Sequence, residues 1–237
     1  MLKLNGMFLR NEHTIKFIFF MSFSTVITAA GKNSRMRKDQ ISRGLDLTNK
    51  LILPFNEKTV LETTIDNALS ANTDKCIVVL GHYSIEIIDA ISDNYESEVK
   101  FIINNPVDVG LSTSLYNGLS NLTSEFALCI TGDQPTVSTE TFNKMIEISQ
   151  KSDNPYKTIS ILRRRKTGLL DTAEGLGMPF VAPRENLMNY LKNENDNLNP
   201  ILRKIFDDGY TFYGVKEKNK KELLNINHYE DYLNLLD

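Results

Sequence analysis

The sequence of 237 residues has no tryptophan, two cysteines and three histidines. Cys76 and Cys129 each lie inside an apolar run, where a thiol usually behaves as a small buried hydrophobic group. We therefore expect neither a disulfide nor a cysteine metal site, and a reducing compartment, the cytoplasm, follows. The histidines, His13, His82 and His228, are scattered and lack the spacing of metal ligands.

An excess of one charge and a long apolar run are also missing. The chain has 27 basic and 30 acidic residues, which are interspersed and give a net charge of -3. It therefore offers no basic face for duplex nucleic acid or for a membrane of anionic lipid. No stretch approaches the ~20 consecutive apolar residues of a membrane-spanning helix. A nucleotide bound by this protein is expected to be a small molecule.

Residues 1–21 contain no turn signal and no clear period of apolar residues. Lys16 precedes the short apolar run 17–21, as in a secretory signal, but hydroxyl residues interrupt the apolar pattern soon afterwards. Cleavage at the small residues that follow would also destroy the first predicted strand. We expect a dispensable leader over 1–21 and one domain over 22–237.

From residue 24 onward, short apolar runs alternate with amphipathic stretches. Strands are predicted over 24–28, 76–80, 99–103, 126–130, 158–162, 178–182 and 211–215, and helices over 60–71, 84–95, 112–122, 138–150, 184–191, 199–206 and 229–236. This alternation predicts a mainly parallel sheet with helices on both faces, a three-layer α/β/α fold. Ligands of such folds bind beyond the carboxyl ends of the strands.

The first predicted strand runs into the small residues Ala29, Ala30 and Gly31, which Arg35 follows. Small side chains let backbone amides converge on anionic oxygens, while the arginine neutralises charge. Lys50, just before another apolar run, supplies a second cation. The pattern indicates a phosphate-binding loop, although alone it is also typical of a plain strand-to-helix turn.

Two further strand ends carry polar residues. Gly110, Ser112 and Ser114 open a predicted helix, where the hydroxyls are suited to capping and the free N–H groups to phosphate, ribose hydroxyls or base carbonyls. Asp133 follows a buried strand in a turn held open by a glycine and a proline, which suits a carboxylate ligand of Mg²⁺. The alternative for Asp133 is an ordinary turn residue.

Six short motifs together resemble one family. They occupy 29–31 with 34–36, 50–54, 105–106 with 110–112 and 114–115, 132–135, 177–179, and 225–227 before 230–232. In this order, from about residue 24 to the end, they resemble the nucleotidyltransferases that attach a nucleotide to molybdopterin. The resemblance implies a Rossmann-like domain that uses an NTP and Mg²⁺, joins NMP to a phosphate-bearing acceptor and releases diphosphate.

The resemblance also implies residue roles. Arg35 and Lys50 would stabilise the α-phosphate and the leaving diphosphate, and Asp133 with Asn227 would hold Mg²⁺. An asparagine brings no charge at a position where the cytidylyl pattern prefers aspartate, so metal affinity should be lower. The implied substrate-binding residues are Ala29, Ala30, Gly31, Ser34, Asn105, Gly110, Ser112 and Ser114.

The loop and the segment 110–118 resemble the cytidylyl branch of the family. Ala30 stands where the guanylyl branch tends to have glycine, and its methyl group narrows the base pocket in favour of a pyrimidine, an effect of about 1–3 kcal/mol. The resemblance therefore favours CTP and molybdopterin as substrates, with transient contact to a molybdoenzyme or its chaperone. The alternatives are GTP or a sugar phosphate in the same fold, or a noncatalytic module that binds nucleotide or cofactor.

Two departures from the family pattern are adjacent. Arg37 stands where a glycine is usual, and residues 38–49 are inserted before Lys50. The insertion is expected to form a helical turn over the nucleotide or to contact the acceptor.

Overall fold

A central sheet of eight strands organises the protein. The computed structural model describes residues 6–11, 14–19, 21–91, 94–95, 97–163 and 165–236. The strands are β3 (Phe23–Ala29), β6 (Cys76–Leu80), β7 (Val99–Ile103), β8 (Phe126–Thr131), β9 (Thr158–Leu162), β10 (Gly168–Leu169), β11 (Phe180–Pro183) and β12 (Thr211–Val215). Their order across the sheet is β10-β12-β9-β11-β8-β3-β6-β7.

Most neighbouring strands run parallel. The pairs β7–β6, β6–β3, β3–β8 and β9–β12 are parallel, whereas β11 is antiparallel to both β8 and β9, and β10 is antiparallel to β12. In this register Ile27 of β3 lies between Val78 and Ile130. β3 is buried along its whole length, as its central position requires. The predicted mainly parallel sheet is confirmed.

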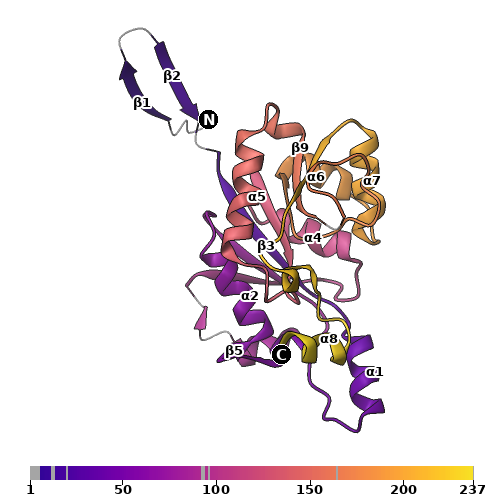
Figure 1. The fold of residues 1–237 in the computed structure, drawn as a ribbon. Helices are drawn as coiled ribbons and strands as arrows, with labels where there is room; N and C mark the ends of the chain where they lie inside the picture. Colours follow the sequence, from indigo (N-terminus) through magenta and orange to yellow (C-terminus); the bar gives the residue numbers. More distant parts are fainter. Residues whose placement is uncertain are drawn as a thin grey trace.

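Helices cover both faces of the sheet (Figure 1). On one face α5 (Thr139–Lys151) packs on β9, β11 and β12, and α2 (Val60–Leu69) packs beside it on β6. On the other face α4 (Leu111–Leu119) packs on β3 and β6, followed by α6 (Arg184–Leu191) and α7 (Leu198–Asp207). α3 (Ser84–Ile91) follows β6, while α1 (Ser34–Ser42) and α8 (Tyr229–Leu236) lie side by side (Figure 1). The three-layer α/β/α fold is thus confirmed.

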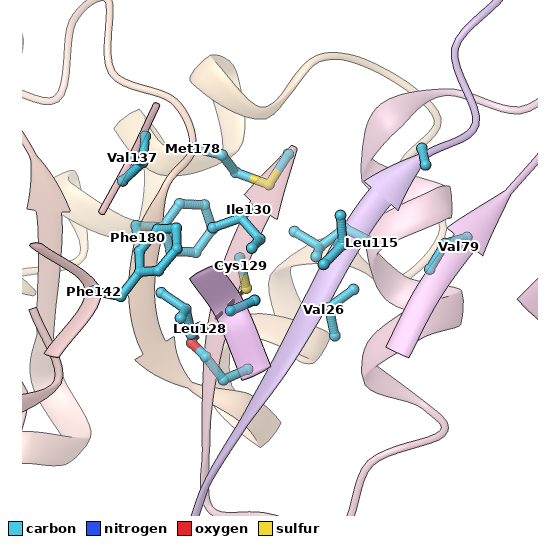
Figure 2. Packing of buried hydrophobic residues seen from close by; sticks show 14 of the residues in the cluster. Val26, Val79, Leu115, Leu128, Cys129, Ile130, Val137, Phe142, Met178 and Phe180 are labelled. Atoms are coloured by element: carbon cyan, nitrogen blue, oxygen red, sulfur yellow. Dashed lines mark hydrogen bonds between the residues drawn. The ribbon is translucent and has the colours of Figure 1, made fainter. Parts of the chain in front are cut away.

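The core lies between the sheet and these helices. Figure 2 shows Leu115 of α4 beside Val26 of β3, and Phe142 of α5 beside Phe180 of β11. All four side chains are at most 1% exposed. This packing fixes the strands, and with them the loops that leave their carboxyl ends.

Several elements differ from the sequence prediction. α1 is a full helix from Ser34, where only a helical turn was expected after position 38. α4 takes Gly110 as its N-cap, so Ser112 lies inside the helix and does not cap it, whereas Ser138 caps α5 as expected. Strands that the sequence did not predict are β10 at the edge of the central sheet, β4 (Pro54–Phe55) with β5 (Lys58–Thr59), and β1 (Gly6–Asn11) with β2 (Thr14–Phe19).

The β1–β2 hairpin falls within the expected leader and stands apart from the central sheet (Figure 1). That this segment is dispensable stays a prediction. Within the described part of the chain, no helix has the length and apolar character needed to cross a membrane.

Both cysteines are buried in strands of the sheet. Cys76 is 3% exposed and Cys129 is fully buried, and neither forms a disulfide. Burial raises the pKa of Cys76 to about 12 and also raises the pKa of Cys129. Because the thiolate is the reactive form, we expect both thiols of the folded protein to resist a disulfide reagent at pH 8 and both to react in denaturant. Rapid labelling of either thiol in the folded protein would contradict this packing.

Candidate active site

A cavity of about 400 Å³ lies at the carboxyl ends of β3 and β8. After β3 the chain moves outward to β6 and β7, and then crosses back to β8 on the other side of β3. The cavity therefore opens where the strand order reverses, the usual ligand position in an open α/β sheet. Its lining is Thr28, Ala29, Ala30, Gly31, Asn33, Arg35, Asn49, Lys50, Leu51, Val109, Leu111, Ser114, Thr131, Asp133, Asn197, Asn225 and Asn227.

The floor of the cavity holds a nearly buried ion pair. Nζ of Lys50 lies 2.5 Å from Oδ2 of Asp133 and donates to the carbonyl oxygen of Ile226 at 2.6 Å. The two side chains are 16% and 13% exposed. Lys50 begins the 3-10 helix η1 (Lys50–Ile52), whose first turn is capped by Asn49 through a 2.9 Å bond to the amide of Leu51. The lysine is thus held from both its backbone and its side chain.

The second oxygen of Asp133, Oδ1, is buried and accepts no hydrogen bond from the residues that the structure describes. A buried carboxylate oxygen without a donor is costly, and a cation would satisfy it. Among the described residues no three His, Cys, Asp or Glu side chains converge as a metal site. One carboxylate is nevertheless compatible with Mg²⁺, which commonly binds one or two protein carboxylates together with water and substrate phosphates.

Asn227 is held beside this carboxylate by the chain that precedes α8. The amide of Ile226 donates to the carbonyl oxygen of Asp133 at 3.0 Å, which joins the two segments directly. Oδ2 of Asp231 accepts from the amide of Asn227 at 2.9 Å. Oδ1 of Asn227 accepts from Arg35 at 2.8 Å and keeps a second lone pair. The residues present therefore fit a magnesium ion held by Asp133, with Asn227 as a neutral oxygen ligand.

The loop after β3 forms the opposite wall. Gly81, at the end of β6, lies against this loop so closely that a Cβ atom there would come within 2.6 Å of the carbonyl oxygen of Ala30. Asn33 adopts the left-handed conformation with φ of 55°, and its Oδ1 accepts from the amide of Lys50 at 3.4 Å. These contacts link the small-residue loop to the lysine.

The structure brings eight of the twelve residues expected in the site into this cavity. They are Ala29, Ala30, Gly31, Arg35, Lys50, Ser114, Asp133 and Asn227. Four others do not line it. Ser34 faces a different hollow, Asn105 is exposed, and Gly110 and Ser112 lie at the first turn of α4.

Two backbone amides at the start of α4 already have partners. The amide of Gly110 donates to Oδ1 of Asn195 at 2.5 Å, and the amide of Ser112 donates to the carbonyl oxygen of Asp196 at 3.1 Å. The hydroxyl of Ser112 accepts from the amide of Asp196 at 2.9 Å. These donors, which the sequence suggested were free for a ligand, instead hold the loop before α7.

Other polar residues of the cavity were not singled out from the sequence. Asn33 lies between Gly31 and Arg35, so its place within the predicted phosphate-binding loop was a signal that the sequence offered. Asn49 caps η1 next to Lys50, and Asn197 reaches the cavity through the loop docked on α4. No local pattern in the sequence identifies Asn197.

We expect Gly110→Ala to displace the docked loop. A Cβ atom at Gly110 would lie 2.7 Å from the backbone carbonyl carbon of Asn195, although the φ of -69° suits any residue. Overpacking against backbone should lower the free energy of unfolding by about 1–3 kcal/mol, measured by urea denaturation. Gly177→Ala is the control, because a Cβ atom at Gly177 would meet no atom within 4 Å and the φ there is not positive. Equal stability of the two variants would show that the contact at Gly110 is not tight.

Comparison with known proteins identifies the family. A model of the MobA-like NTP transferase domain matches residues 25–205. The chain belongs to this family. A nucleotidyl transferase from Methanothermobacter is 42% identical, with a TM-score of 0.84 over 91% of this chain and 96% of that chain. This MobA-like protein is therefore a nucleotidyltransferase, of a family that uses an NTP and a phosphate-bearing acceptor.

More distant relatives share parts of this MobA-like chain or its fold. The bifunctional protein GlmU of Francisella tularensis is 25% identical over 195 residues, which are 82% of this chain but 38% of that protein. A structure of Rv0371c from Mycobacterium tuberculosis, in complex with manganese, is 22% identical with a TM-score of 0.62, covering 91% of this chain and 98% of that chain. The second similarity shows the fold alone.

Proposed function

We propose that this MobA-like transferase moves CMP from CTP to a terminal phosphate of molybdopterin in the presence of Mg²⁺ and releases diphosphate. The proposal rests on the Lys50–Asp133 ion pair in the cavity, where Oδ1 of Asp133 has no donor among the described residues. Ala30 lines the cavity, and an alanine in place of a glycine at this position supports a pyrimidine over a purine.

Catalysis of this reaction depends on the positioning of the phosphate groups and on neutralisation of their charge more than on proton transfer. A phosphate oxygen of the acceptor attacks the α-phosphorus in line, the new P–O bond forms, and the bond to diphosphate breaks. No general base is needed, because the attacking phosphate is already anionic near neutral pH. The residues of the cavity therefore act by orienting the phosphates and by stabilising their charge.

Lys50 and Arg35 supply the positive charge. Two of the three ammonium donors of Lys50 bond to Asp133 and Ile226, which leaves one for a phosphate oxygen. Arg35 donates to Asn227 and keeps further N–H groups for the triphosphate. Asp133 and Asn227 would hold Mg²⁺, which supplies Lewis-acid stabilisation of the phosphate oxygens when bound.

A sugar phosphate is the second candidate acceptor. Five asparagines line the cavity, and their amide groups can both donate to and accept from sugar hydroxyls. These are Asn33, Asn49, Asn197, Asn225 and Asn227. Such a lining also suits the polar ring system of a pterin.

The test is diphosphate release from each of the four NTPs with Mg²⁺, with and without molybdopterin, and in parallel with a hexose 1-phosphate. Release from CTP that depends on molybdopterin is the expected result. Preference for GTP would overturn the choice of nucleotide, and release only with the hexose phosphate would favour the second candidate. Nucleotide binding without release in any combination would contradict transfer and favour a noncatalytic module.

A further inference from the structure

A second hollow lies on the other side of the phosphate loop. This α1 hollow has a volume of about 380 Å³ and is lined by Lys32, Ser34, Arg37, Lys38, Ile41 and Tyr83. Along the loop the residues alternate: Gly31, Asn33 and Arg35 line the candidate active site, whereas Lys32 and Ser34 line the α1 hollow. The loop is thus a shared wall between two separate spaces.

One regular face of α1 forms much of the hollow. Ser34, Arg37, Lys38 and Ile41 are spaced at i, i+3, i+4 and i+7, so they share one side of the helix. Met36 is buried on another side. The hollow is therefore built on an ordered helix that the core holds in place.

Two of the three cations that line the hollow have no acidic partner among the described residues. Lys32 pairs with Asp108 at 2.7 Å. Arg37 donates to the hydroxyl of Tyr83 at 3.1 Å, but within the described ranges neither Arg37 nor Lys38 forms an ion pair with a carboxylate. The first turn of α1 contains no acidic residue that could pair with them. An anion in the hollow would offset the repulsion between the neighbouring cations Arg37 and Lys38.

Apolar groups complete the lining. Ile41 is 65% exposed, and the half-buried ring of Tyr83 lies on the other element of the hollow. An aromatic ring beside an aliphatic side chain suits a planar or apolar group more than it suits a hydrated inorganic ion. The hollow therefore suits a ligand in which an anionic group is attached to an organic part.

We propose that the α1 hollow is a second binding site, which takes an organic phosphate other than the NTP. Its phosphate group binds Arg37, Lys38 and the hydroxyl of Ser34, and its organic part lies against Ile41 and Tyr83. The hydroxyl of Tyr83 donates to the carbonyl oxygen of Lys32 at 3.3 Å, so a bound ligand contacts the support of the phosphate loop. Occupancy is therefore expected to alter the loop that holds the nucleotide.

Titration of the full chain with phenyl phosphate, followed by amide NMR shifts, tests this site without relying on the proposed activity. We expect shifts at residues 34–41 and at Tyr83 that survive in Lys50→Gln. In the double variant Arg37→Gln with Lys38→Gln, affinity should fall by about tenfold or more, because two charge-assisted contacts are lost. The matched control, Lys75→Gln with Lys192→Gln, removes two exposed charges elsewhere and should bind as the unaltered protein does.

Three results would overturn the proposal. Shifts confined to residues 29–31 and 131–133 would place the ligand in the nucleotide cavity. An equal loss of affinity in the control variant would show that the loss comes from the change in net charge and not from contacts in the hollow. Inorganic phosphate binding as tightly as phenyl phosphate would exclude a contribution from Ile41 and Tyr83, and with it the organic ligand.

Discussion

Asp133→Ala is expected to abolish Mg²⁺-dependent nucleotidyl transfer while the protein stays folded. The variant loses Oδ1, which has no donor among the described residues and is the proposed metal ligand, and it loses the counter-charge of Lys50. Loss of such an electrostatic group commonly costs about 10²–10³ in kcat, and loss of the metal as well should bring transfer close to background. The measurement is steady-state diphosphate release over a range of Mg²⁺ concentrations.

Stability distinguishes loss of function from loss of fold in this variant. Removing Asp133 leaves Lys50 bonded to the carbonyl oxygen of Ile226, so the free energy of unfolding should fall by only about 1–2 kcal/mol. Asp153→Ala removes an exposed carboxylate far from the cavity lining and is the matched control. A near-normal rate in Asp133→Ala would remove this residue from the catalytic site.

Lys50→Met should impair both activity and stability. The ammonium group is lost as a phosphate ligand, and we expect kcat/KM to fall by about 10²–10³. In addition, Oδ2 of the nearly buried Asp133 carboxylate loses its only donor among the described residues, and Oδ1 already has none there, so the free energy of unfolding should fall by about 2–4 kcal/mol. Urea denaturation measures this, and the loss should exceed that of Asp133→Ala.

A double variant separates the two effects of Lys50. When Lys50→Met is combined with Asp133→Leu, the unpaired carboxylate is gone, so part of the lost stability should return while activity stays absent. Lys75→Met, at an exposed lysine, controls for loss of charge. The single variant Asp133→Leu completes the comparison. If the stability loss of the double variant equals the sum of the losses in Lys50→Met and Asp133→Leu, the ion pair contributes nothing to folding.

The sheet could be predicted because its strands have an unambiguous local signature. The runs at Cys76–Leu80 and Phe126–Thr131 are apolar, rich in β-branched residues or small residues, and bounded by polar turns. α1 could not be predicted in full, because in Ser34–Ser42 only Met36 and Gln40 are buried and no apolar period marks the helix. Its position depends on contacts with distant residues.

Part of the site was predictable because its residues follow strands with a clear local signature. Lys50 and Asp133 are 83 residues apart, and Arg35 and Asn227 are 192 apart, yet each follows a recognisable strand or belongs to a recognisable motif. The carboxyl ends of parallel strands meet at one edge of the sheet, so local motifs there predict a common site. Contacts between two loops carry no such signal, which is why the docking of Asn195 on α4 was not predicted.

Amide hydrogen exchange with CTP and Mg²⁺ tests most directly that the cavity beside Lys50 and Asp133 is the nucleotide site. We expect slower exchange in the proposed phosphate-binding loop, residues 29–35, and in the segments 131–134 and 225–228 that carry the proposed metal ligands. Asp133→Ala should lose this protection when Mg²⁺ is present. Protection confined to other parts of the chain, or unchanged exchange in all three segments at saturating CTP, would contradict the assignment.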